Sequence, residues 1–471
     1  MVNFTTDNTE ALRAEKNSRA DRMGNKIHFT SLGCARNLVD TEVMIGLLLQ
    51  AGYEATPSSQ EADFLVVNTC GFLAASREES CQTIGQLLQE KKRDAKMIVA
   101  GCMVQKHKHE LQERFPGIHY YLGSGDMDKI LEAVRASSPG AAVTSAKSFL
   151  QQGEIPRFTS TPKHYAYLKI AEGCAKRCAF CIIPTIKGAL RSKSIEQVVK
   201  EFNALLAQGV YEVILIAQDL GDFGKERKET DGLENLLREM LKVEKDFWLR
   251  LLYLYPDEIT DGLIELIQND KRICPYLDMP IQHINDTMLK SMRRKTSRSQ
   301  IIATLEKLRK AIPDITIRTS LMVGFPGETD EQFEELLTFV QEYPLDNVGI
   351  FKFSAEEGAA ASKFSGQVSE EVKEERYTRL VATQMAQVSS RNQRFVGKRL
   401  SVIVEGYHPE SDLLMRGRFA GQCPEIDGQV IINDGRKVNA FGQLYDVEIT
   451  DIAGYDLIGR VVKAKRALQL V

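Results

Sequence analysis

Apolar positions in the first part of the chain form short runs separated by longer stretches with helical spacing. The short runs predict strands at Lys26–Ser31, Phe64–Asn68, Met97–Ala100 and Tyr120–Leu122. The longer stretches predict helices at Leu38–Gln50, Ser76–Lys92, Val104–Phe115 and Met127–Ala136. Because strands alternate with helices, residues 26–138 are expected to form an N-terminal parallel α/β domain. The polar residues 1–25 before it are expected to be a flexible tail.

A second alternating region follows residues 139–163, whose prolines and glycine predict a linker. Its apolar runs predict six strands at Ala166–Ala171, Val213–Ala217, Leu249–Leu254, Leu277–Ile281, Thr316–Val323 and Val348–Phe353. Helical patterns lie between them, for example at Ile195–Gln208, Leu233–Val243 and Ser299–Ala311. Six βα units predict a partial (β/α)6 barrel over residues 164–366 rather than a closed eightfold one.

The pattern changes twice more toward the carboxyl end. Residues 367–394 are charged with helical spacing and predict a connecting helix. From Phe395 onward, short alternating runs are separated by turn residues. They predict a small antiparallel β-barrel of about five strands over residues 395–471. Barrels of this kind often dock nucleic acid or protein.

Composition places the chain among globular proteins and excludes several partners. It has 471 residues, 43% apolar and 27% charged, with a formal net charge of −3. This length suits about three domains, and the charge argues against DNA binding through bulk positive charge. No apolar run approaches membrane-spanning length, and the first residues lack the order of a signal peptide. We therefore expect a cytoplasmic protein with no membrane partner.

Three cysteines, Cys174, Cys178 and Cys181, fall within eight residues directly after the first predicted barrel strand. Iron–sulfur clusters are held by cysteine thiolates, normally four of them. A four-iron cluster held by three thiolates keeps one iron open to a small molecule. Cys178 and Cys181 alone have the spacing of half a zinc site, but no second Cys/His pair stands nearby at finger spacing. Disulfides are disfavoured by the odd count of nine cysteines and the lack of a secretory signal.

A second set of cysteines follows three neighbouring strands of the N-terminal domain. Cys34, Cys70 and Cys102 each lie just beyond a strand end and beside a glycine. Each alone would more often be a small buried residue than a ligand. The carboxyl ends of parallel strands meet at one edge of a sheet, so these thiols are expected to converge. They would again form a three-thiolate set, suited to a second four-iron cluster.

The Cys-x3-Cys-x2-Cys spacing, with Phe180 before the last cysteine, resembles the pattern of radical S-adenosylmethionine (SAM) enzymes. The whole chain after residue 25 resembles the methylthiotransferase family, which combines an N-terminal cluster domain, a radical SAM barrel and a TRAM domain. The resemblance implies two [4Fe-4S] clusters and SAM. Cys174, Cys178 and Cys181 would hold the cluster that cleaves SAM to a radical, and Cys34, Cys70 and Cys102 an auxiliary cluster. A flavodoxin- or ferredoxin-type protein would supply electrons.

Within that family, several stretches resemble the branch that modifies a ribosomal protein. They are Ser31–Asp40, Tyr276–His283, Val323–Thr329 and Pro424–Gly428. The transfer-RNA branch usually reads Gly-Cys-Gln-Met-Asn where this chain reads Gly33-Cys34-Ala35-Arg36-Asn37. The resemblance implies transfer of a methylthio group to the β-carbon of an aspartate in small-subunit ribosomal protein twelve, free or in the assembled subunit.

Two other functions stay open on the residues alone. One is the same chemistry on a modified adenosine beside the anticodon of transfer RNA. The other is a non-catalytic electron carrier, which does not explain why both cysteine sets stop at three. Residues 395–471 contain ten Lys/Arg and ten Asp/Glu, a balance that suits a basic ribosomal protein better than RNA phosphates. Glu425 and Asp427 are expected to be exposed carboxylates that steer this partner.

Several residues are candidates for SAM contact. Gln218 and Asp219 end the second barrel strand and are expected to meet the methionyl part of SAM, or else to cap a helix or turn. Gly324 and Gly327 would let the backbone approach the adenosine. That glycine segment also suits an ordinary turn before a Thr329/Gln332 capping box.

Two departures from the family pattern affect these contacts. The chain reads Gln218-Asp219-Leu220 where the family tends to have Gln-Asp-Thr, and Lys187-Gly188 where it tends to have Arg-Gly. His283 is expected either near the site or in a satisfied structural role. The remaining cysteines have no partner at useful spacing and are expected to be packing residues: Cys81, Cys274 and Cys423.

Overall fold

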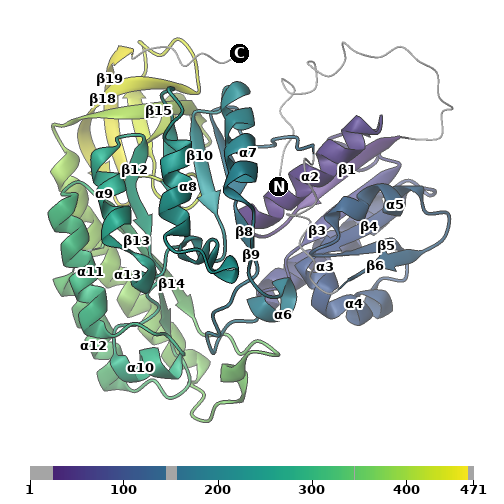
Figure 1. Ribbon diagram of the computed structural model, residues 1–471, viewed down its shortest axis with the longest axis horizontal. Helices are drawn as coiled ribbons and strands as arrows, with labels where there is room; N and C mark the ends of the chain where they lie inside the picture. Colours follow the sequence, from purple (N-terminus) through teal and green to yellow (C-terminus); the bar gives the residue numbers. More distant parts are fainter. Residues whose placement is uncertain (1–24, 145–155, 344, 465–471) are drawn as a thin grey trace.

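The computed structural model describes residues 25–144, 156–343 and 345–464. The tail expected over residues 1–25 lies outside these ranges except for Asn25, as does the middle of the expected linker. Within the described residues the chain forms two six-stranded sheets and a closed five-stranded barrel (Figure 1). No helix of the described part is long and apolar enough to span a membrane.

The N-terminal sheet has the order β2-β1-β3-β4-β5-β6, and every strand pair in it is parallel. Its strands are β1 (Lys26–Ser31), β2 (Glu54–Ala55), β3 (Phe64–Thr69), β4 (Lys96–Gly101), β5 (Ile118–Gly123) and β6 (Gly140–Ala142). Its helices are α2 (Ala35–Gln50), α3 (Ala74–Glu90), α4 (Cys102–Arg114), and η2 with α5 (Met127–Lys129 and Ile130–Arg135). The four predicted strands and the parallel architecture are confirmed.

Apolar side chains project from both faces of this sheet, and helices cover both faces, as is usual for parallel sheets. Val66 and Ile98 pack on one face with residues of α2 and α5, whereas Val67 and Val99 pack on the other with residues of α3 and α4. Strand β6 lies within the segment expected to be a linker, so that expectation is wrong for these three residues. Their Gly-Ala-Ala sequence has low strand propensity and directly follows turn residues, which hides the strand.

The second sheet has the order β14-β13-β12-β11-β10-β7 and is also parallel throughout. Its strands are β7 (Tyr165–Lys169), β10 (Glu212–Ile216), β11 (Trp248–Leu251), β12 (Ile273–Asp278), β13 (Thr316–Val323) and β14 (Asn347–Lys352). The helices that pack on one of its faces are α7 (Ile195–Ala207), α8 (Gly232–Met240), α9 (Asp261–Asn269), α11 (Arg298–Ala311) and α12 (Asp330–Glu342). Because β7 and β14 do not pair with each other, the predicted partial barrel is confirmed.

The C-terminal barrel follows the long helix α13 (Glu370–Asn392). Its strands are β15 (Arg399–His408), β16 (Ser411–Phe419), β17 (Val430–Asp434), β18 (Gln443–Ala453) and β19 (Asp456–Ala464), closed in the order β15-β16-β17-β19-β18. Five strands are confirmed, but the pair β17–β19 is parallel rather than antiparallel. Strand direction cannot alternate all the way around a ring with an odd number of strands, so closure requires one such pair.

The C-terminal barrel packs against the amino ends of the second sheet, at the end away from α10 (Asp286–Ser291) (Figure 1). Ile403 and Cys423 join Tyr165 and Trp248 in one apolar cluster on the inner face of that sheet. This insertion explains a wrong expectation. Asp427 is not an exposed carboxylate: its side chain is 1% exposed and lies 3.5 Å from Arg318 Nε.

Glu425 differs from Asp427 in its exposure. Glu425 is exposed, as expected, and accepts a hydrogen bond from the Tyr165 hydroxyl at 3.0 Å. Asp427 accepts one from the backbone N–H of Cys423 at 2.9 Å and therefore holds the inserted turn closed. Of the two carboxylates expected to be exposed, only Glu425 is.

The carboxyl edges of the two parallel sheets face each other. Ser124, after β5, donates to the carbonyl of Ile186 in α6 (Ile183–Lys187) at 3.2 Å. Glu356, after β14, accepts from Arg77 of α3 at 2.7 Å. Figure 1 shows α6 beside α3 and α4 at this boundary. The strand ends that carry the two cysteine sets are therefore directed toward one interface.

Candidate active site

The cysteine loop after β7 is held by backbone and side-chain donors. Cys174 N–H donates to the carbonyl of Gly188 at 3.2 Å, which ties the two ends of the loop together. Two backbone N–H groups reach sulfur atoms: Lys176 to Cys174 Sγ and Ile183 to Cys181 Sγ, both at 3.4 Å. Burial raises the pKa of Cys174 to about 11 and that of Cys181 to about 12, and neighbouring thiols of the set contribute.

The third thiol of this loop contacts side chains from distant elements. Cys178 Sγ lies 3.3 Å from the Tyr255 hydroxyl and 3.8 Å from an Arg294 guanidinium nitrogen. The Arg294 guanidinium also lies over the Tyr255 ring, 3.8 Å from its centroid. Donors aimed at a ligand sulfur are one of the means by which proteins tune iron–sulfur centres.

The structure brings Cys34, Cys70 and Cys102 together at the end of β1, β3 and β4, as the parallel topology predicts. Two glycines make this approach possible. A Cβ on Gly33 would lie 2.8 Å from Cys70 Cβ, and one on Gly71 would lie 2.7 Å from the backbone of Cys102. Any side chain at either position would push the thiols apart.

The pKa values of these thiols are shifted in different directions. Burial acts to raise the pKa of Cys34, but Arg36, backbone N–H groups and Lys187 outweigh it and lower that pKa. Burial raises the pKa of Cys102 to about 12, opposed by Lys187. Cys34 is thus the thiol of this set that most readily becomes a thiolate.

The spacing of both sets is wider than a single zinc ion needs. A tetrahedral zinc site with bonds of about 2.3 Å holds its sulfur atoms about 3.8 Å apart. Among the described residues, three possible ligand atoms lie within 4.8 Å of one another only at Asp219, Asp222 and Glu258. The sulfur atoms of each cysteine set therefore do not all lie within this distance of one another. All nine cysteines are free of disulfides. Each triad therefore suits a larger polynuclear group better than zinc.

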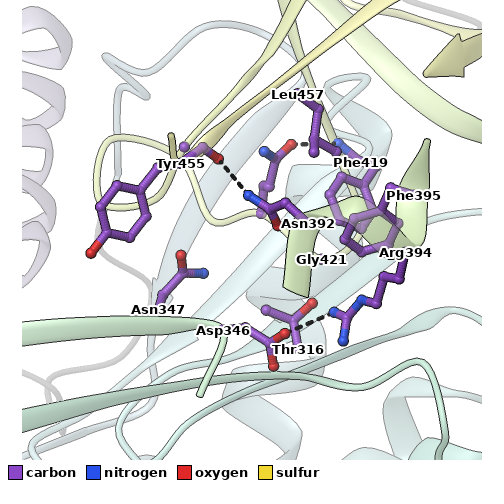
Figure 2. Close-up of a pocket in the computed structure, with 12 residues that line it drawn as sticks. Thr316, Asp346, Asn347, Asn392, Arg394, Phe395, Phe419, Gly421, Tyr455 and Leu457 are labelled. Carbon is purple, nitrogen blue, oxygen red and sulfur yellow. Dashed lines mark hydrogen bonds and ion pairs between the residues drawn. The ribbon is translucent and has the colours of Figure 1, made fainter. Parts of the chain in front are cut away.

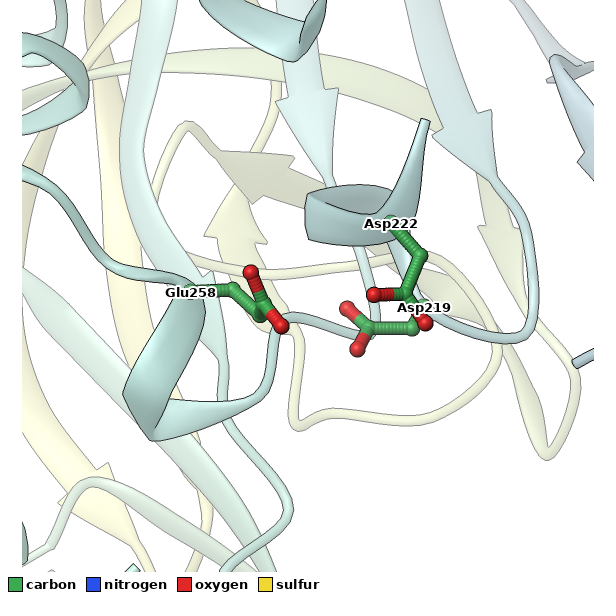
Figure 3. A group of neighbouring side chains, drawn as sticks. All are labelled: Asp219, Asp222 and Glu258. Carbon is green, nitrogen blue, oxygen red and sulfur yellow. The ribbon is translucent and has the colours of Figure 1, made fainter. Parts of the chain in front are cut away.

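The three carboxylates of that acidic group turn toward one another (Figure 3). They surround an ammonium of the cysteine loop: Lys176 Nζ lies 2.8 Å from Asp219 and 2.7 Å from Glu258. Asp222 is 3.6 Å from the same nitrogen. The group is therefore an ion-pair network that anchors the cysteine loop to the loops after β10 and β11.

Asp219 and its neighbour Gln218, both expected to contact SAM, have different surroundings. Asp219 accepts from Gly221 N–H at 3.1 Å and binds Lys176, so the structure accounts for it as a turn and loop anchor. Burial raises its pKa to about 6, against the pull of Lys176. Both amide atoms of Gln218 are buried and have no hydrogen-bond partner among the described residues. An amide of this kind is costly unless a ligand completes it.

Comparison with known proteins agrees with this architecture. Models of three families match the chain: the uncharacterized protein family UPF0004 over residues 26–123, the Radical SAM superfamily over 168–340, and the TRAM domain over 396–462. The ribosomal protein uS12 methylthiotransferase RimO of Protochlamydia amoebophila is 62% identical over 444 residues, 94% of each chain. That of Bdellovibrio bacteriovorus is 45% identical over 447 residues, 93% of this chain and 97% of its own.

The chain belongs to the RimO family of methylthiotransferases. It is therefore a radical SAM enzyme. A solved structure of the radical SAM methyltransferase TsrM from Kitasatospora setae, with cobalamin and a [4Fe-4S] cluster bound, has a TM-score of 0.52 at 16% identity. The matched region covers 70% of this chain and 72% of the TsrM chain. At this low identity the match shows a shared fold alone.

The segment Gly324–Gly327 of this RimO family member follows β13. It lies beside the cysteine loop, where Phe325 and Ala179 belong to one apolar cluster. The Gly324 N–H donates to Glu328 at 2.6 Å, and a Cβ there would collide with Lys373 of α13. Around Gly327, by contrast, a Cβ would meet no atom within 4 Å. The predicted Thr329/Gln332 capping box is present. Packing thus explains Gly324, whereas the space at Gly327 stays open.

The other sequence candidates have structural roles. His283 is fully buried, with Nε2 3.1 Å from Glu328, and Nδ1 accepts from Asn285 N–H at 3.0 Å. The packing roles expected for the three remaining cysteines are confirmed, since each is buried in an apolar cluster: Cys81, Cys274 and Cys423. Lys187 is buried and lies 2.6 Å from Glu172.

No pattern in the sequence assigns a role to Tyr255, Arg294 or Arg36. Tyr255 and Arg294 reach Cys178 from loops 77 and 116 residues away in sequence, and no spacing signal connects such positions. A separate pocket lies at the amino end of β13, between α13 and the C-terminal barrel, with Asp346 and Arg394 in its wall (Figure 2). It is at the opposite end of β13 from the glycine segment and takes no part in this site.

Proposed function

We propose that this chain transfers a methylthio group to the β-carbon of an aspartate in ribosomal protein uS12 of the small subunit. The observation that carries the proposal is the presence of two three-cysteine sets at the facing carboxyl edges of two parallel sheets. A relative 62% identical over 94% of this chain bears the name of this activity.

Each cysteine set fits a [4Fe-4S] cluster with one iron left for another ligand. Cys174, Cys178 and Cys181 would hold the cluster that, when bound, supplies the electron for reductive cleavage of SAM. Cys34, Cys70 and Cys102 would hold the auxiliary cluster, which supplies the sulfur to be transferred. A flavodoxin- or ferredoxin-type protein would be the electron donor. Ribosomal substrate and reductant would both meet the enzyme in the cytoplasm.

Residues of this chain position SAM and protect the reaction. The unpartnered amide of Gln218 would bind polar atoms of SAM. Asp219 acts beside it mainly by holding Lys176. The open space at Gly327 would admit part of the adenosine, and Gly324 shapes the same turn. Around Cys102, the apolar residues Ile182, Ile186 and Ala359 exclude water from the boundary between the sheets.

Each segment expected from the sequence would have its own role in this reaction. Residues 26–138 carry the auxiliary set, and residues 164–366 carry the radical-generating set. Of the segment 139–163, Gly140–Ala142 belongs to the N-terminal sheet as β6, and the residues after it link the two parts. The helix 367–394 and the barrel 395–471 would present the protein substrate.

One experiment tests the substrate. Reconstituted enzyme with SAM and a reductant is offered uS12 and an isopentenylated transfer RNA in the same reaction. Mass spectrometry is expected to find the methylthio group on an aspartate of uS12. Methylthio product on the RNA alone would overturn the proposal.

A further inference from the structure

The Arg36 side chain crosses the boundary between the two sheets where both cysteine sets lie. It leaves the first turn of α2, and one guanidinium nitrogen donates to the carbonyl of Ala217, after β10, at 2.7 Å. The guanidinium lies over the Tyr253 ring, 5.0 Å from its centroid. Tyr253 has a left-handed backbone with φ of 64°, a strained conformation that commonly marks functional sites.

Arg36 is placed near residues of both sets. It lies two residues after Cys34, and Ala217, whose carbonyl it binds, is two residues before Asp219. Asp219 in turn lies 2.8 Å from Lys176, in the loop of the other set. The guanidinium therefore lies at the boundary where a substrate would meet both sets.

Arg36 differs from other arginines buried at the boundaries between the sheets and the barrel. Arg157 lies 2.6 Å from Glu42, Arg250 lies 2.6 Å from Glu212, and Arg418 lies 2.8 Å from Glu212. Within the described ranges, Arg36 has no carboxylate at ion-pair distance, and its one hydrogen bond uses a single nitrogen. A guanidinium has five N–H donors in a planar fork that matches a carboxylate.

We propose that Arg36 binds the carboxylate of the target aspartate and so places its β-carbon between the two cysteine sets. This inference rests on the proposed function. The carboxyl carbon of the aspartate side chain is bonded directly to the β-carbon. A contact that holds the carboxylate therefore also positions the β-carbon. An asparagine has one acceptor oxygen where aspartate has two, and its NH2 group would face a donor of Arg36, so the same contact disfavours it. Arg36 is thus a specificity-determining residue.

The alternative role for Arg36 is to balance thiolate charge in the cysteine sets. The two roles differ in what they predict. A charge-balancing arginine would be needed to keep iron bound, whatever the substrate. A carboxylate-binding arginine would be needed for choice between aspartate and asparagine, with the iron content retained.

The test uses the full chain, reconstituted with iron and sulfide, and two forms of uS12 that carry Asp or Asn at the modified position. Iron content and kcat/KM for methylthio transfer are measured for the wild type, Arg36→Gln, Arg36→Lys and Arg379→Gln. Arg379 is an exposed arginine of α13 and serves as the matched control. Transfer is followed by mass spectrometry of the intact protein.

We expect the wild type to prefer the Asp form by about 100-fold or more. Arg36→Gln should lower kcat/KM for the Asp form by about 100-fold and reduce the preference to less than about tenfold, with iron retained. Arg36→Lys keeps the charge but not the fork, and should give an intermediate preference. Arg379→Gln should match the wild type.

Two outcomes would overturn the inference. One is an unchanged Asp/Asn preference in Arg36→Gln. The other is loss of iron from Arg36→Gln, which would assign the residue to the cysteine sets. If wild-type enzyme fails to modify either form of uS12, the proposed function itself fails, and this result is distinct from both.

Discussion

Lys187 Nζ of the second sheet's α6 lies 3.4 Å from Asp40 Oδ2 in α2 of the N-terminal sheet. Glu172 lies 2.6 Å from the same nitrogen, and Lys169 binds both Asp40 and Glu172. The four side chains are each 3% exposed or less. Two bases and two acids thus form a neutral buried network that joins the two sheets beside the cysteine sets.

Asp40→Asn should destabilise this boundary strongly. Removing one acid leaves an uncompensated buried ammonium, which costs about 3 kcal/mol or more of unfolding free energy. Denaturant unfolding of the variant and the wild type measures the change. Lys92→Gln, which breaks an exposed pair with Asp63, is the control and should change stability by about 0.5 kcal/mol or less. Equal effects of the two substitutions would contradict the role given to the network.

Iron content and SAM cleavage should distinguish the roles of the two cysteine sets. Reconstituted wild type should bind about eight iron atoms, as two four-iron clusters. Replacing Cys174, Cys178 and Cys181 together with alanine should leave about half of the iron and abolish SAM cleavage. Iron analysis and chromatography of 5′-deoxyadenosine provide the measurement. Production of 5′-deoxyadenosine by that variant would show that the roles of the two sets are assigned wrongly.

The complementary variant replaces Cys34, Cys70 and Cys102 with alanine. These residues lie in the N-terminal sheet, so the loop after β7 keeps its own contacts. The variant should lose about half of the iron and still cleave SAM, but form no methylthio product. Cys81→Ala, which changes a buried packing thiol, is the control and should keep transfer. Methylthio product from the triple variant would remove the auxiliary set from the mechanism.

Much of the fold was predictable because most strands of the two parallel sheets, unlike β6, are compact apolar runs between turn residues. The convergence of Cys34, Cys70 and Cys102 also followed from topology, since the ends of parallel strands share one edge. The parallel β17–β19 pair follows from closure of five strands, a property of the ring that no local pattern contains.

The environment of the site was less predictable. Arg36 meets Ala217 and Tyr253 across 181 or more residues of sequence, and no periodicity connects these positions. Asp427 stands in a polar turn close to the exposed Glu425, and it is buried because this turn packs against the second sheet, where the distant Arg318 faces it. The sequence identifies Asp219 as a polar residue at a strand end, but its partner Lys176 lies inside the cysteine motif. Such pairings depend on how the loops pack together.

Glu405 makes the C-terminal barrel's attachment sensitive to acid. Burial acts to raise its pKa, but Arg418 and His164 outweigh burial and lower it from 4.5 to about 2. The unfolded chain therefore binds a proton at higher pH than the folded chain. The stabilisation is complete above about pH 4.5 and is lost as the pH falls toward about 2.

Glu405→Gln should remove this dependence. Stability at neutral pH should fall by up to about 3 kcal/mol, and the steep loss of stability between pH 4.5 and 2 should become shallower. Thermal unfolding across this range gives the comparison, with the exposed Glu61→Gln as control. If Glu405→Gln lost stability with acid as steeply as the wild type, the carboxylate would not be the source of the effect.

Gln218 offers a test in which two measurements should move in opposite directions. Its buried amide has no partner among the described residues, so without a ligand it costs free energy. Gln218→Met keeps a similar volume and removes the polar atoms. The iron-loaded variant should be more stable than the wild type by about 1 kcal/mol in the absence of SAM.

With SAM present the order should reverse, because the variant lacks the hydrogen bonds that SAM would satisfy. We expect the SAM dissociation constant to rise about tenfold and the SAM-induced shift in Tm to shrink accordingly. Equilibrium dialysis and thermal unfolding supply the two values, and Gln86→Met, on the exposed face of α3, should alter neither. A variant with lower stability and unchanged SAM affinity would mean that the Gln218 amide is satisfied within the protein, and the SAM contact would be withdrawn.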